Sequence, residues 1–172
     1  MERIKLRRYT PSRDLSHLYY FHTQDDLPLY STQLCFNTEQ QFNNWLQLRL
    51  RNDFHDFFMI DMNKETIGFV YNYCFSPIDG HCKIAVYIDG SYRKFGIGAL
   101  AAIHFMDYLF STYSIRKIYL TIYDYNEQSL KSNLQAGFIS EGCLKQYRYL
   151  DGKFFDLHYL SISREKFQNS LR

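Results

Sequence analysis

The sequence lacks the features that mark several large classes of protein. No stretch approaches the ~20 consecutive apolar residues that a membrane-spanning helix needs. The six histidines show no HxxxH or HExxH spacing and the four cysteines no CxxC spacing, so we expect no metal site. A net charge of +2, with no long run of Lys or Arg, does not favour a nucleic-acid partner.

The cysteines and the first residues indicate a reducing compartment. The chain begins with the charged run Met1–Lys5 and no apolar stretch follows it, so we expect no secretory leader. Disulfides persist mainly in oxidising compartments. We therefore interpret Cys35, Cys74, Cys82 and Cys143 as reduced thiols of a cytoplasmic protein.

The hydrophobic pattern predicts a chain that mixes strands and helices. A length of 172 residues suits one domain with a substantial core, and we expect a single domain over residues 1–172. Periods of two and of about 3.6 residues identify the elements. In chain order these are a strand at 4–9, helices from 11 and from 39, strands at 57–62, 66–75 and 81–88, a helix at 99–110, a strand at 117–123, a short helix that ends at Gly137, a strand that resumes at 138–139, and a hairpin within 147–163. This order predicts an α+β fold.

A glycine-containing loop in mid-chain is the strongest functional signal. The strand at 81–88 stops at a turn, Gly96 and Gly98 follow, and a helix begins at once. Glycine adopts backbone conformations that a side chain forbids, so successive N–H groups can turn toward an anion. The helix N-terminus adds partial positive charge. The loop therefore predicts a phosphate site, although it matches neither the G-x-G-x-x-G fingerprint nor a P-loop.

Several short motifs together resemble one family. They are Arg93-Lys94-Phe95-Gly96-Ile97-Gly98, Asn126-Glu127-Gln128-Ser129, Gly137-Phe138, Glu141-Gly142, Gly152-Lys153-Phe154-Phe155-Asp156 and Tyr159-Leu160-Ser161. The first resembles the Q/R-x-x-G-x-G/A loop of the GNAT superfamily of acyl-CoA N-acyltransferases. The others are similar to motifs of its branch of ribosomal-protein N-acetyltransferases and spermidine acetyltransferases. The resemblance covers residues 57–163 well, and the earlier part only in its order of elements.

The resemblance implies a fold and a co-substrate. The fold would be the three-layer GNAT fold, a mostly antiparallel central sheet with a splayed fourth strand and flanking helices. The co-substrate would be acetyl-CoA, with its pantetheine arm on the backbone of Val86, Tyr87 and Ile88. Backbone N–H groups along the loop would hold its pyrophosphate, at Arg93, Lys94, Phe95, Gly96, Ile97, Gly98 and Ala99. Asn126 matches a position whose side chain touches the cofactor arm in the family, although a helix cap alone would also explain it.

The proton-handling residues of that branch do not carry over. Lys83 stands where the branch often has a glutamate base, and Asn133 stands where it often has a tyrosine acid. The enzyme could rely on positioning and solvent, or recruit another group; Asn133, Tyr87 and Asp124 are the weak catalytic candidates, with Tyr123 and Tyr125 nearby in sequence. A third reading is a chain that binds acyl-CoA without catalysis.

The resemblance implies transfer of acetyl from acetyl-CoA to a primary amine by direct attack. The branch acts on polyamines, protein N-termini, amino-sugars and aminoglycosides, so the partner would be a small-molecule or peptide amine. Carboxylates at Asp25, Asp26 and Glu39 would favour a polyamine or an aminoglycoside, but a solvated loop and a helix cap explain them as well. The alternative is a non-catalytic acyl-CoA-binding or scaffolding module. Homodimers are common in the branch.

Overall fold

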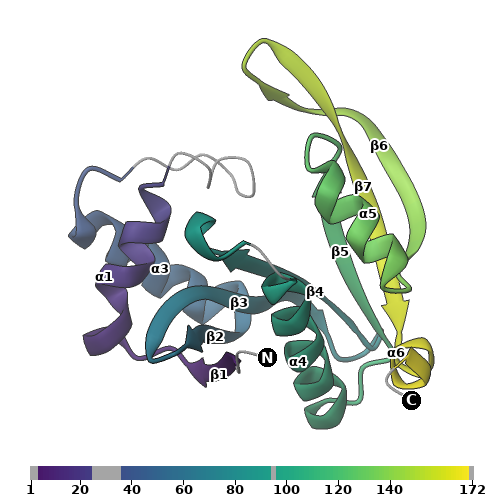
Figure 1. The fold of residues 1–172 in the computed structure, drawn as a ribbon, viewed down its shortest axis with the longest axis horizontal. Helices are drawn as coiled ribbons and strands as arrows, with labels where there is room; N and C mark the ends of the chain where they lie inside the picture. Colours follow the sequence, from purple (N-terminus) through teal and green to yellow (C-terminus); the bar gives the residue numbers. More distant parts are fainter. Residues whose placement is uncertain (1–3, 25–35, 94–95, 171–172) are drawn as a thin grey trace. The chain divides into compact units, whose positions relative to one another are not determined.

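The structure of the protein is a computed structural model that describes residues 4–24, 36–93 and 96–170. Within these ranges the chain forms seven strands, five α-helices and one short 3-10 helix (Figure 1). In chain order they are β1 (Ile4–Arg8), α1 (Pro11–His22), α3 (Glu39–Asn52), β2 (Phe54–Met62), β3 (Glu65–Ser76), β4 (His81–Ile88), η1 (Gly90–Tyr92), α4 (Ile97–Thr112), β5 (Lys117–Tyr123), α5 (Glu127–Gln135), β6 (Ile139–Leu150), β7 (Lys153–Ser163) and α6 (Arg164–Ser170).

The strands form one open sheet in the order β1-β2-β3-β4-β5-β7-β6. The pairs β1–β2, β2–β3, β5–β7 and β6–β7 are antiparallel, and β4–β5 is parallel. The predicted α+β fold with a mostly antiparallel sheet is therefore confirmed. The β4–β5 ladder joins His81, Cys82 and Lys83 to Lys117, Ile118 and Tyr119, and it ends there.

The chain divides into two compact units, and β4 and α4 contribute to both. The first unit is Met1–Cys74 with Ala85–Phe105, and the second is Phe75–Ile84 with Met106–Arg172. A single domain over residues 1–172 stays a prediction.

The first unit has an aromatic core between its helices and its strands. In Figure 1, α1 and α3 lie side by side, and the Tyr19 and Phe42 rings meet at 5.8 Å between centroids. The predicted helix starts are correct: Pro11 is the first residue of α1, and the Thr38 hydroxyl accepts the Gln41 N–H at 3.2 Å. The buried core residues are Leu18, Phe21, Phe42, Leu46, Phe57, Met59, Phe69 and Tyr87.

A buried ion pair ties α1 to β1. Arg7 donates two hydrogen bonds to Asp14, at 2.6 and 2.7 Å, and a third to Asp61 at 2.6 Å. Asp14 is fully buried. Burial by itself raises the pKa of Asp14, but hydrogen bonds from Arg7 and from the Thr10 N–H outweigh it and leave that pKa below its usual value.

Two expectations for the first unit need correction. β2 begins at Phe54 rather than at residue 57, because a register shift between Phe54 and Phe57 interrupts the alternation that marks a strand. The sequence also predicts an apolar stripe on α4, which is only partly correct: Met106 and Phe110 are buried, Ala102 and Ile103 are half-buried and Ala99 is exposed. Ala101 and Phe105 are buried outside that stripe. The side chains of α4 are apolar on most sides of the helix, so periodicity alone could not select its buried side.

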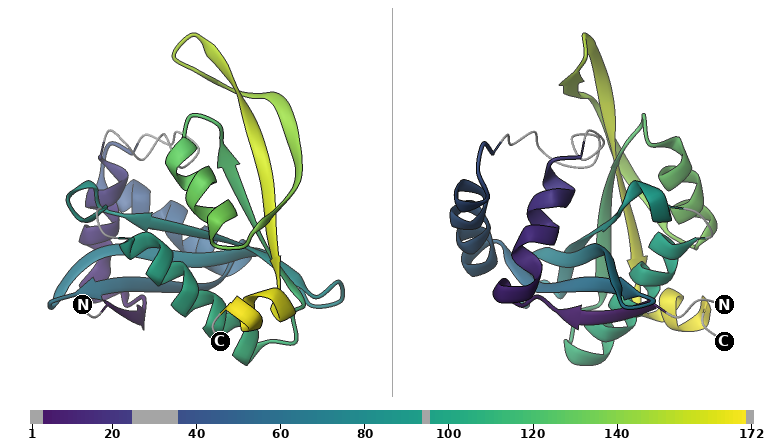
Figure 2. Two further views of the ribbon diagram at one scale, coloured as in Figure 1. Left: turned by 45° about the vertical axis from the view of Figure 1, so that its right-hand side comes forward. Right: turned by 60° about the vertical axis from the view of Figure 1, so that its left-hand side comes forward.

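The second unit is built on β5, β7 and β6. Figure 2 shows β6 and β7 as one long twisted hairpin, and its predicted turn at Asp151 and Gly152 has positive φ at both residues, 47° and 81°. β6 begins at Ile139, where the sequence predicts that a strand resumes, but it runs without a break to Leu150; irregularities at Gly142 and Gln146 interrupt the pattern between 139 and 147, so this continuity was not predicted.

The sequence reading missed α6, which is stabilised by an arginine. Arg164 donates to the carbonyl oxygens of Ile115 at 2.9 Å and of Tyr113 at 2.6 Å, and also to that of Phe110. It thereby satisfies the Phe110 carbonyl in the last turn of α4, which a helix leaves unpaired, and two carbonyls of the segment that follows the helix.

Three features of composition can be checked in the described ranges. No helix there is long and apolar enough to cross a membrane. No group of His, Cys, Asp and Glu side chains in those ranges could hold a metal ion. Cys74, Cys82 and Cys143 are free thiols, and Cys35 lies outside the described residues.

Candidate active site

The turn after β4 is fastened to β3. The Asp89 N–H donates to the Ile67 carbonyl at 2.8 Å, and the Asp89 carboxylate accepts the Ser91 N–H at 2.9 Å. The Tyr92 hydroxyl donates to the carboxylate of Glu65, at the first residue of β3. These bonds fix the start of the loop before it reaches Gly96.

Gly96 has the conformation that the loop prediction requires, but Gly98 does not. Gly96 has φ of +73°, and its carbonyl accepts the Leu100 N–H at 3.0 Å, so it is the N-cap of α4. Gly98 is an ordinary helical residue without positive φ, and a Cβ there would meet Ile88 Cγ1 at 3.6 Å, a normal contact. The expectation that both glycines are needed for backbone conformation is therefore wrong for Gly98.

The first turn of α4 presents backbone donors. The N–H groups of Ile97, Gly98 and Ala99 have no acceptor within the helix, because helical bonding starts with Leu100. A Cβ added at Gly96 would meet no described atom within 4 Å. This open helix N-terminus can receive an anion. The predicted contacts at Lys94 and Phe95 lie outside the described residues.

The Arg93 side chain turns back onto β4. Its Nε donates to the Ile88 carbonyl at 2.8 Å, and its guanidinium carbon lies 5.4 Å from the centroid of the Tyr87 ring. Arg93 thus positions the end of β4 with its side chain, in addition to any role of its backbone N–H.

Only part of the backbone at 86–88 faces away from β3. The Tyr87 carbonyl lies against Gly68 of β3, where an added Cβ would come within 2.1 Å of that oxygen. The Asp89 N–H also points to β3. Because backbone groups alternate along a strand, Val86 and Ile88 present theirs to the other edge. Sequence reasoning missed Gly68; the signal was a glycine inside a strand pattern, which marks close backbone approach.

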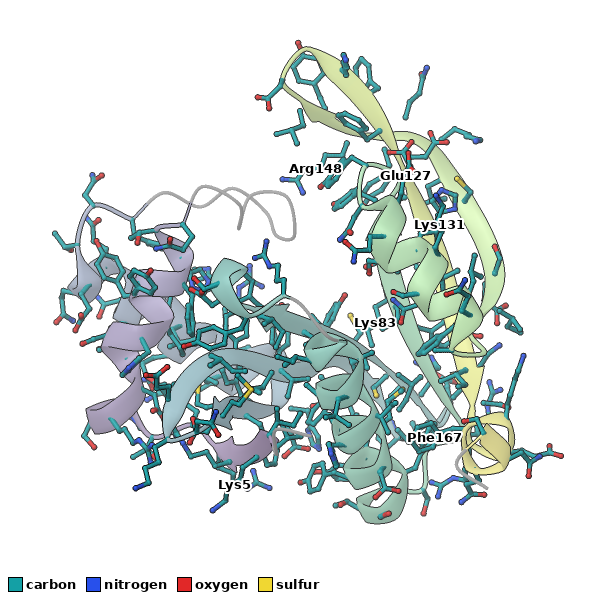
Figure 3. The ribbon with its side chains drawn as sticks, viewed as in Figure 1. Lys5, Lys83, Glu127, Lys131, Arg148 and Phe167 are labelled. Carbon is teal, nitrogen blue, oxygen red and sulfur yellow. The ribbon has the colours of Figure 1, made fainter. Side chains whose placement is uncertain are left out.

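Lys83 lies in the second unit, on an aromatic ring. Its Nζ is 4.7 Å from the centroid of Tyr159 and 3.5 Å from the Tyr159 hydroxyl. In the parallel ladder Lys83 is paired with Tyr119. Figure 3 labels Lys83 on its strand. The Lys83 ammonium on the Tyr159 ring makes a cation–π contact. Lys83 does not provide the carboxylate base that the branch often has at this position.

The asparagine candidates of the second unit both bond within their own helix. Asn126 is the N-cap of α5, and its side-chain oxygen accepts the Ser129 N–H at 3.3 Å. Asn133 donates from Nδ2 to the Ser129 carbonyl at 2.8 Å. An amide has no proton to release near neutral pH, so Asn133 cannot replace a tyrosine as a general acid.

The remaining candidates gather at the end of β5. Asp124 donates its N–H to the Asp156 carbonyl at 3.1 Å, and its buried Oδ1 has no hydrogen-bond partner among the described residues. Tyr123 and Tyr125 stack at 5.3 Å between centroids, and Arg148 donates to the Tyr125 hydroxyl at 3.0 Å. Burial raises the pKa of Tyr125 to about 12, so this phenol is neutral at physiological pH.

The predicted acceptor carboxylates do not form a described cluster. Glu39 lies in the first turn of α3, as expected for a helix start. Asp25 and Asp26 lie outside the described residues. Tyr87, the last catalytic candidate, is a buried core residue stacked on Phe69 at 5.2 Å.

Comparison with known proteins decides the family. The sequence profile described as the acetyltransferase (GNAT) domain matches residues 3–139. The chain belongs to the GNAT acetyltransferase family. The predicted resemblance is therefore confirmed, and GNAT enzymes use acetyl-CoA as their co-substrate.

Two sequence relatives lie in the same family. An uncharacterised SPbeta prophage-derived N-acetyltransferase of Bacillus subtilis, YokL, is 20% identical over 124 residues, which cover 72% of this chain and 70% of that protein. The ribosomal-protein-serine acetyltransferase of Escherichia coli is 29% identical over 101 residues, 59% of this chain and 56% of that protein.

Solved structures share the fold. The spermidine N-acetyltransferase of Vibrio cholerae, in complex with CoA and spermine, has a TM-score of 0.87 at 19% identity, with 96% of this chain and 98% of that chain covered. A probable GNAT-family acetyltransferase of Chromobacterium violaceum has a TM-score of 0.81 at 19% identity, with 98% and 86% covered. At this identity the likeness establishes the fold alone.

Proposed function

We propose that the protein transfers the acetyl group of acetyl-CoA to a primary amine by direct attack. The observation that carries the proposal is the run from β4 to α4. Gly96, at φ of +73°, caps a helix whose first N–H groups are open, directly after a strand tied to Ile67. Such a run suits the pyrophosphate of CoA.

The first unit would hold the co-substrate through its backbone. The N–H groups of Ile97, Gly98 and Ala99 would bind the pyrophosphate, and the outward backbone groups of Val86 and Ile88 would bind the pantetheine arm. Arg93, bonded to the Ile88 carbonyl at 2.8 Å, would hold that edge in place. Of the predicted backbone contacts, Tyr87 is the one that we do not retain, because its carbonyl faces Gly68.

The proposed reaction balances without a further co-reactant. A neutral amine nitrogen forms a bond to the thioester carbonyl carbon, and the carbon–sulfur bond then breaks. The nitrogen loses a proton and the departing CoA thiolate gains one, so the products are the amide and free CoA thiol. Backbone donors beside the carbonyl oxygen would stabilise the charge that develops on it.

Solvent is the simplest carrier of the protons. Lys83 and Asn133 are engaged with Tyr159 and Ser129 and lack the chemistry of a glutamate and a tyrosine. Positioning two reactants can by itself lower a barrier by about 7–11 kcal/mol. The chain would thus rely on orientation and on backbone electrostatics.

The test is release of free thiol from acetyl-CoA across a panel of amines. The panel holds peptides with free N-termini, polyamines, amino-sugars and aminoglycosides, and mass spectrometry identifies the acetylated product. We expect amine-dependent thiol release with at least one class. Binding of CoA at micromolar concentration without turnover on any amine would reject the enzyme and favour the second candidate.

The second candidate is a non-catalytic acyl-CoA-binding or scaffolding module. The specific observation in its favour is the engagement of Asn133, whose amide is bonded back to Ser129 where the branch often has a tyrosine acid. Both candidates need the same cofactor loop, so only turnover separates them.

A further inference from the structure

His22, the last residue of α1, is a titratable side chain packed among aromatic rings of the first unit. Its ring centroid lies 4.6 Å from that of Phe42, 5.7 Å from that of Trp45 and 6.0 Å from that of Phe69. The His22 and Phe69 rings are stacked, with 9° between their planes. Contacts with α3 and β3 therefore fix the place of the imidazole.

A hydrogen bond fixes the tautomer of this imidazole. Nδ1 lies 2.8 Å from the Leu18 carbonyl oxygen, which can only accept, so Nδ1 carries the proton and the neutral ring keeps its lone pair on Nε2. His22 is half-buried. No described residue bonds Nε2, and Nε2 is not among the described polar atoms that are buried without a partner. Within the described chain this lone pair is therefore open to a ligand or to water.

The surroundings keep the imidazole neutral. Burial lowers the pKa of His22, and the hydrogen bond to the Leu18 carbonyl offsets only part of that effect. No described charge is among the causes of this shift. A histidine of this kind is unprotonated at pH 7 and can accept a proton there.

The charged and titratable groups on the same cluster do not oppose this role. Arg49 of α3 lies on the Trp45 ring, with its guanidinium carbon 5.8 Å from the centroid, and is paired with Asp53 at 2.6 Å. On β3, the Tyr71 ring stacks on Phe69 at 6.2 Å, and burial raises the pKa of this phenol, so it stays neutral. The described neighbours thus add no free carboxylate that would hold a proton on His22.

The end of α1 lies beside the end of β4 in the same unit. Phe21, next to His22, has its ring 5.4 Å from that of Tyr87, and Phe69, on which His22 stacks, lies 5.2 Å from the same ring. Tyr87 stands between the two residues whose outward backbone groups would bind the pantetheine arm. His22 is therefore two ring contacts away from the strand end that would hold the thioester.

Within the first unit, α1 and α4 cover opposite faces of the strands. Tyr87 belongs to the core under α1 and α3, whereas Ile88, the next residue of β4, would meet a Cβ at Gly98 of α4 at 3.6 Å. The same alternation on β2 brings Phe58 onto Phe105 of α4 at 5.7 Å. CoA bound at the N-terminus of α4 reaches β4 from the Ile88 side, which leaves the face under α1 for the attacking amine.

We propose that His22 is the general base of the acetyl transfer and that its Nε2 takes the proton of the attacking amine, directly or through one water. The inference rests on the proposed function and assigns to a side chain the step that solvent would otherwise carry. As the nitrogen–carbon bond forms, an N–H bond of the amine breaks and the imidazole becomes imidazolium. The departing thiolate gains a proton from water, and His22 returns its proton to water, so the protons balance.

Two substitutions remove the base and keep different parts of its structure. His22→Asn retains an amide donor for the Leu18 carbonyl, and His22→Phe retains a ring between Phe42 and Phe69. With the best acceptor among peptides, polyamines, amino-sugars and aminoglycosides, we expect each to lower kcat at least ~100-fold at unchanged CoA affinity. The control His17→Asn removes an exposed histidine of the same helix and leaves kcat unchanged. Circular dichroism confirms that each variant is folded.

Proton transfer leaves signatures that a packing role would not. In the wild type, single-turnover rates fall as the pH drops through the lowered pKa of His22, and His22→Asn lacks this limb while keeping the one that belongs to the amine. Imidazole added to His22→Ala raises the rate in proportion to its concentration. Long-range proton–nitrogen NMR spectra at pH 7 show Nδ1 of His22 protonated and Nε2 bare.

The outcomes are distinct. Turnover by the wild type with unchanged kcat in His22→Asn overturns this inference but keeps the proposed function, and so does an Nε2 that is protonated at pH 7. Loss of kcat with the pH profile unchanged and without rescue by imidazole gives His22 a packing role, which also overturns the inference. Absence of turnover with every amine, with CoA binding retained, rejects the proposed function and this inference with it.

Discussion

The two units of the molecule carry different kinds of chemical groups. The first unit presents main-chain groups: the N–H donors that follow Gly96 and the outward edge of β4 at Val86 and Ile88. The second unit presents side chains, such as Lys83 on Tyr159 and Arg148 on Tyr123. Main-chain chemistry depends on conformation and side-chain chemistry on residue type. Substitution can therefore change the second unit's role without disturbing the fold.

The units also differ in how their charges are held. In the first, Arg7 reaches Asp14 and Asp61 in a partly buried network, with Asp14 fully inaccessible. In the second, the Lys145–Asp156 pair leaves its lysine largely exposed. Buried pairs are costly to break, whereas exposed pairs are worth little. The following changes test this difference, in order of decreasing expected effect on stability.

Arg7→Met should destabilise the first unit the most. It leaves the buried Asp14 carboxylate without its partner, which costs about 3–5 kcal/mol. The measurement is the free energy of unfolding from urea denaturation. The matched control is Arg49→Met, which breaks a half-exposed pair with Asp53 and should cost about 0.5 kcal/mol. Equal losses of unfolding free energy in the two variants would contradict the difference between buried and exposed ion pairs.

The same pair predicts a pH dependence. The folded-state pKa of Asp14 lies below its usual value of 3.8, so its contribution is fully present above that pH and is lost as the pH falls through the lower folded value. In Arg7→Met, burial instead raises the pKa of Asp14, so acidification relieves the variant. The difference in stability between wild type and variant should therefore begin to shrink above pH 3.8, as Asp14 of the variant takes up its proton, and should shrink further below that pH. If the stability difference between wild type and Arg7→Met stayed constant from pH 7 to pH 3, the lowered pKa of Asp14 would be refuted.

Alanine substitutions at the two glycines of the loop should change the free energy of unfolding in opposite directions. Gly96→Ala places a side chain at φ of +73° and should cost about 1–2 kcal/mol, with loss of CoA binding. Gly98→Ala adds a methyl group in ordinary contact with Ile88 and favours the helix by up to ~1 kcal/mol.

The Gly98 variant separates binding from folding. We expect Gly98→Ala to keep or raise stability while CoA affinity falls about tenfold, because the methyl group narrows the approach to the helix N-terminus. Calorimetric titration with CoA measures the affinity. Unchanged affinity in Gly98→Ala would show that the phosphate site depends on Gly96 alone.

The sequence could predict the features that depend on local patterns, and it could not predict those that depend on contacts between distant segments. The strand–loop–helix run at 81–99 was correct in its order, and β4 and β5 have the predicted bounds, because alternation, glycine and capping residues are local signals. The Arg93 bond to Ile88 depends on a contact between a loop and a strand, which no local pattern encodes. Gly68 left a local signal, a glycine inside a strand pattern, but only the contact with Tyr87 shows why it is needed. The bond from Asn133 to Ser129 joins residues four apart on α5, so the predicted helix brings them together, but the sequence did not show which partner the amide would take.

Two substitutions of Asn126 can distinguish its role as a helix cap from a contact with the cofactor. Asn126→Ala removes the acceptor of the Ser129 N–H and should cost about 1 kcal/mol. Asn126→Asp keeps that acceptor but loses the amide donor, so it should retain stability. Reduced CoA affinity in Asn126→Asp would support the contact with the cofactor arm; wild-type affinity there would leave the residue as a cap alone.

Asn133→Tyr should affect stability the least and the chemistry in an informative direction. The native side chain donates one hydrogen bond to the Ser129 carbonyl on the half-exposed side of α5, and its loss should cost less than about 1 kcal/mol.

A tyrosine there restores the acid of the branch, and general acid catalysis typically contributes about 10²–10⁴-fold. If protonation of the thiolate limits the reaction, kcat should rise at least tenfold at unchanged KM for acetyl-CoA. Single-turnover rates across pH 6–9 are the measurement, with Asn133→Phe as the control for ring bulk. An equal change in both variants would mean that the bulk of the ring causes it, and that a phenol proton at position 133 is not what changes catalysis.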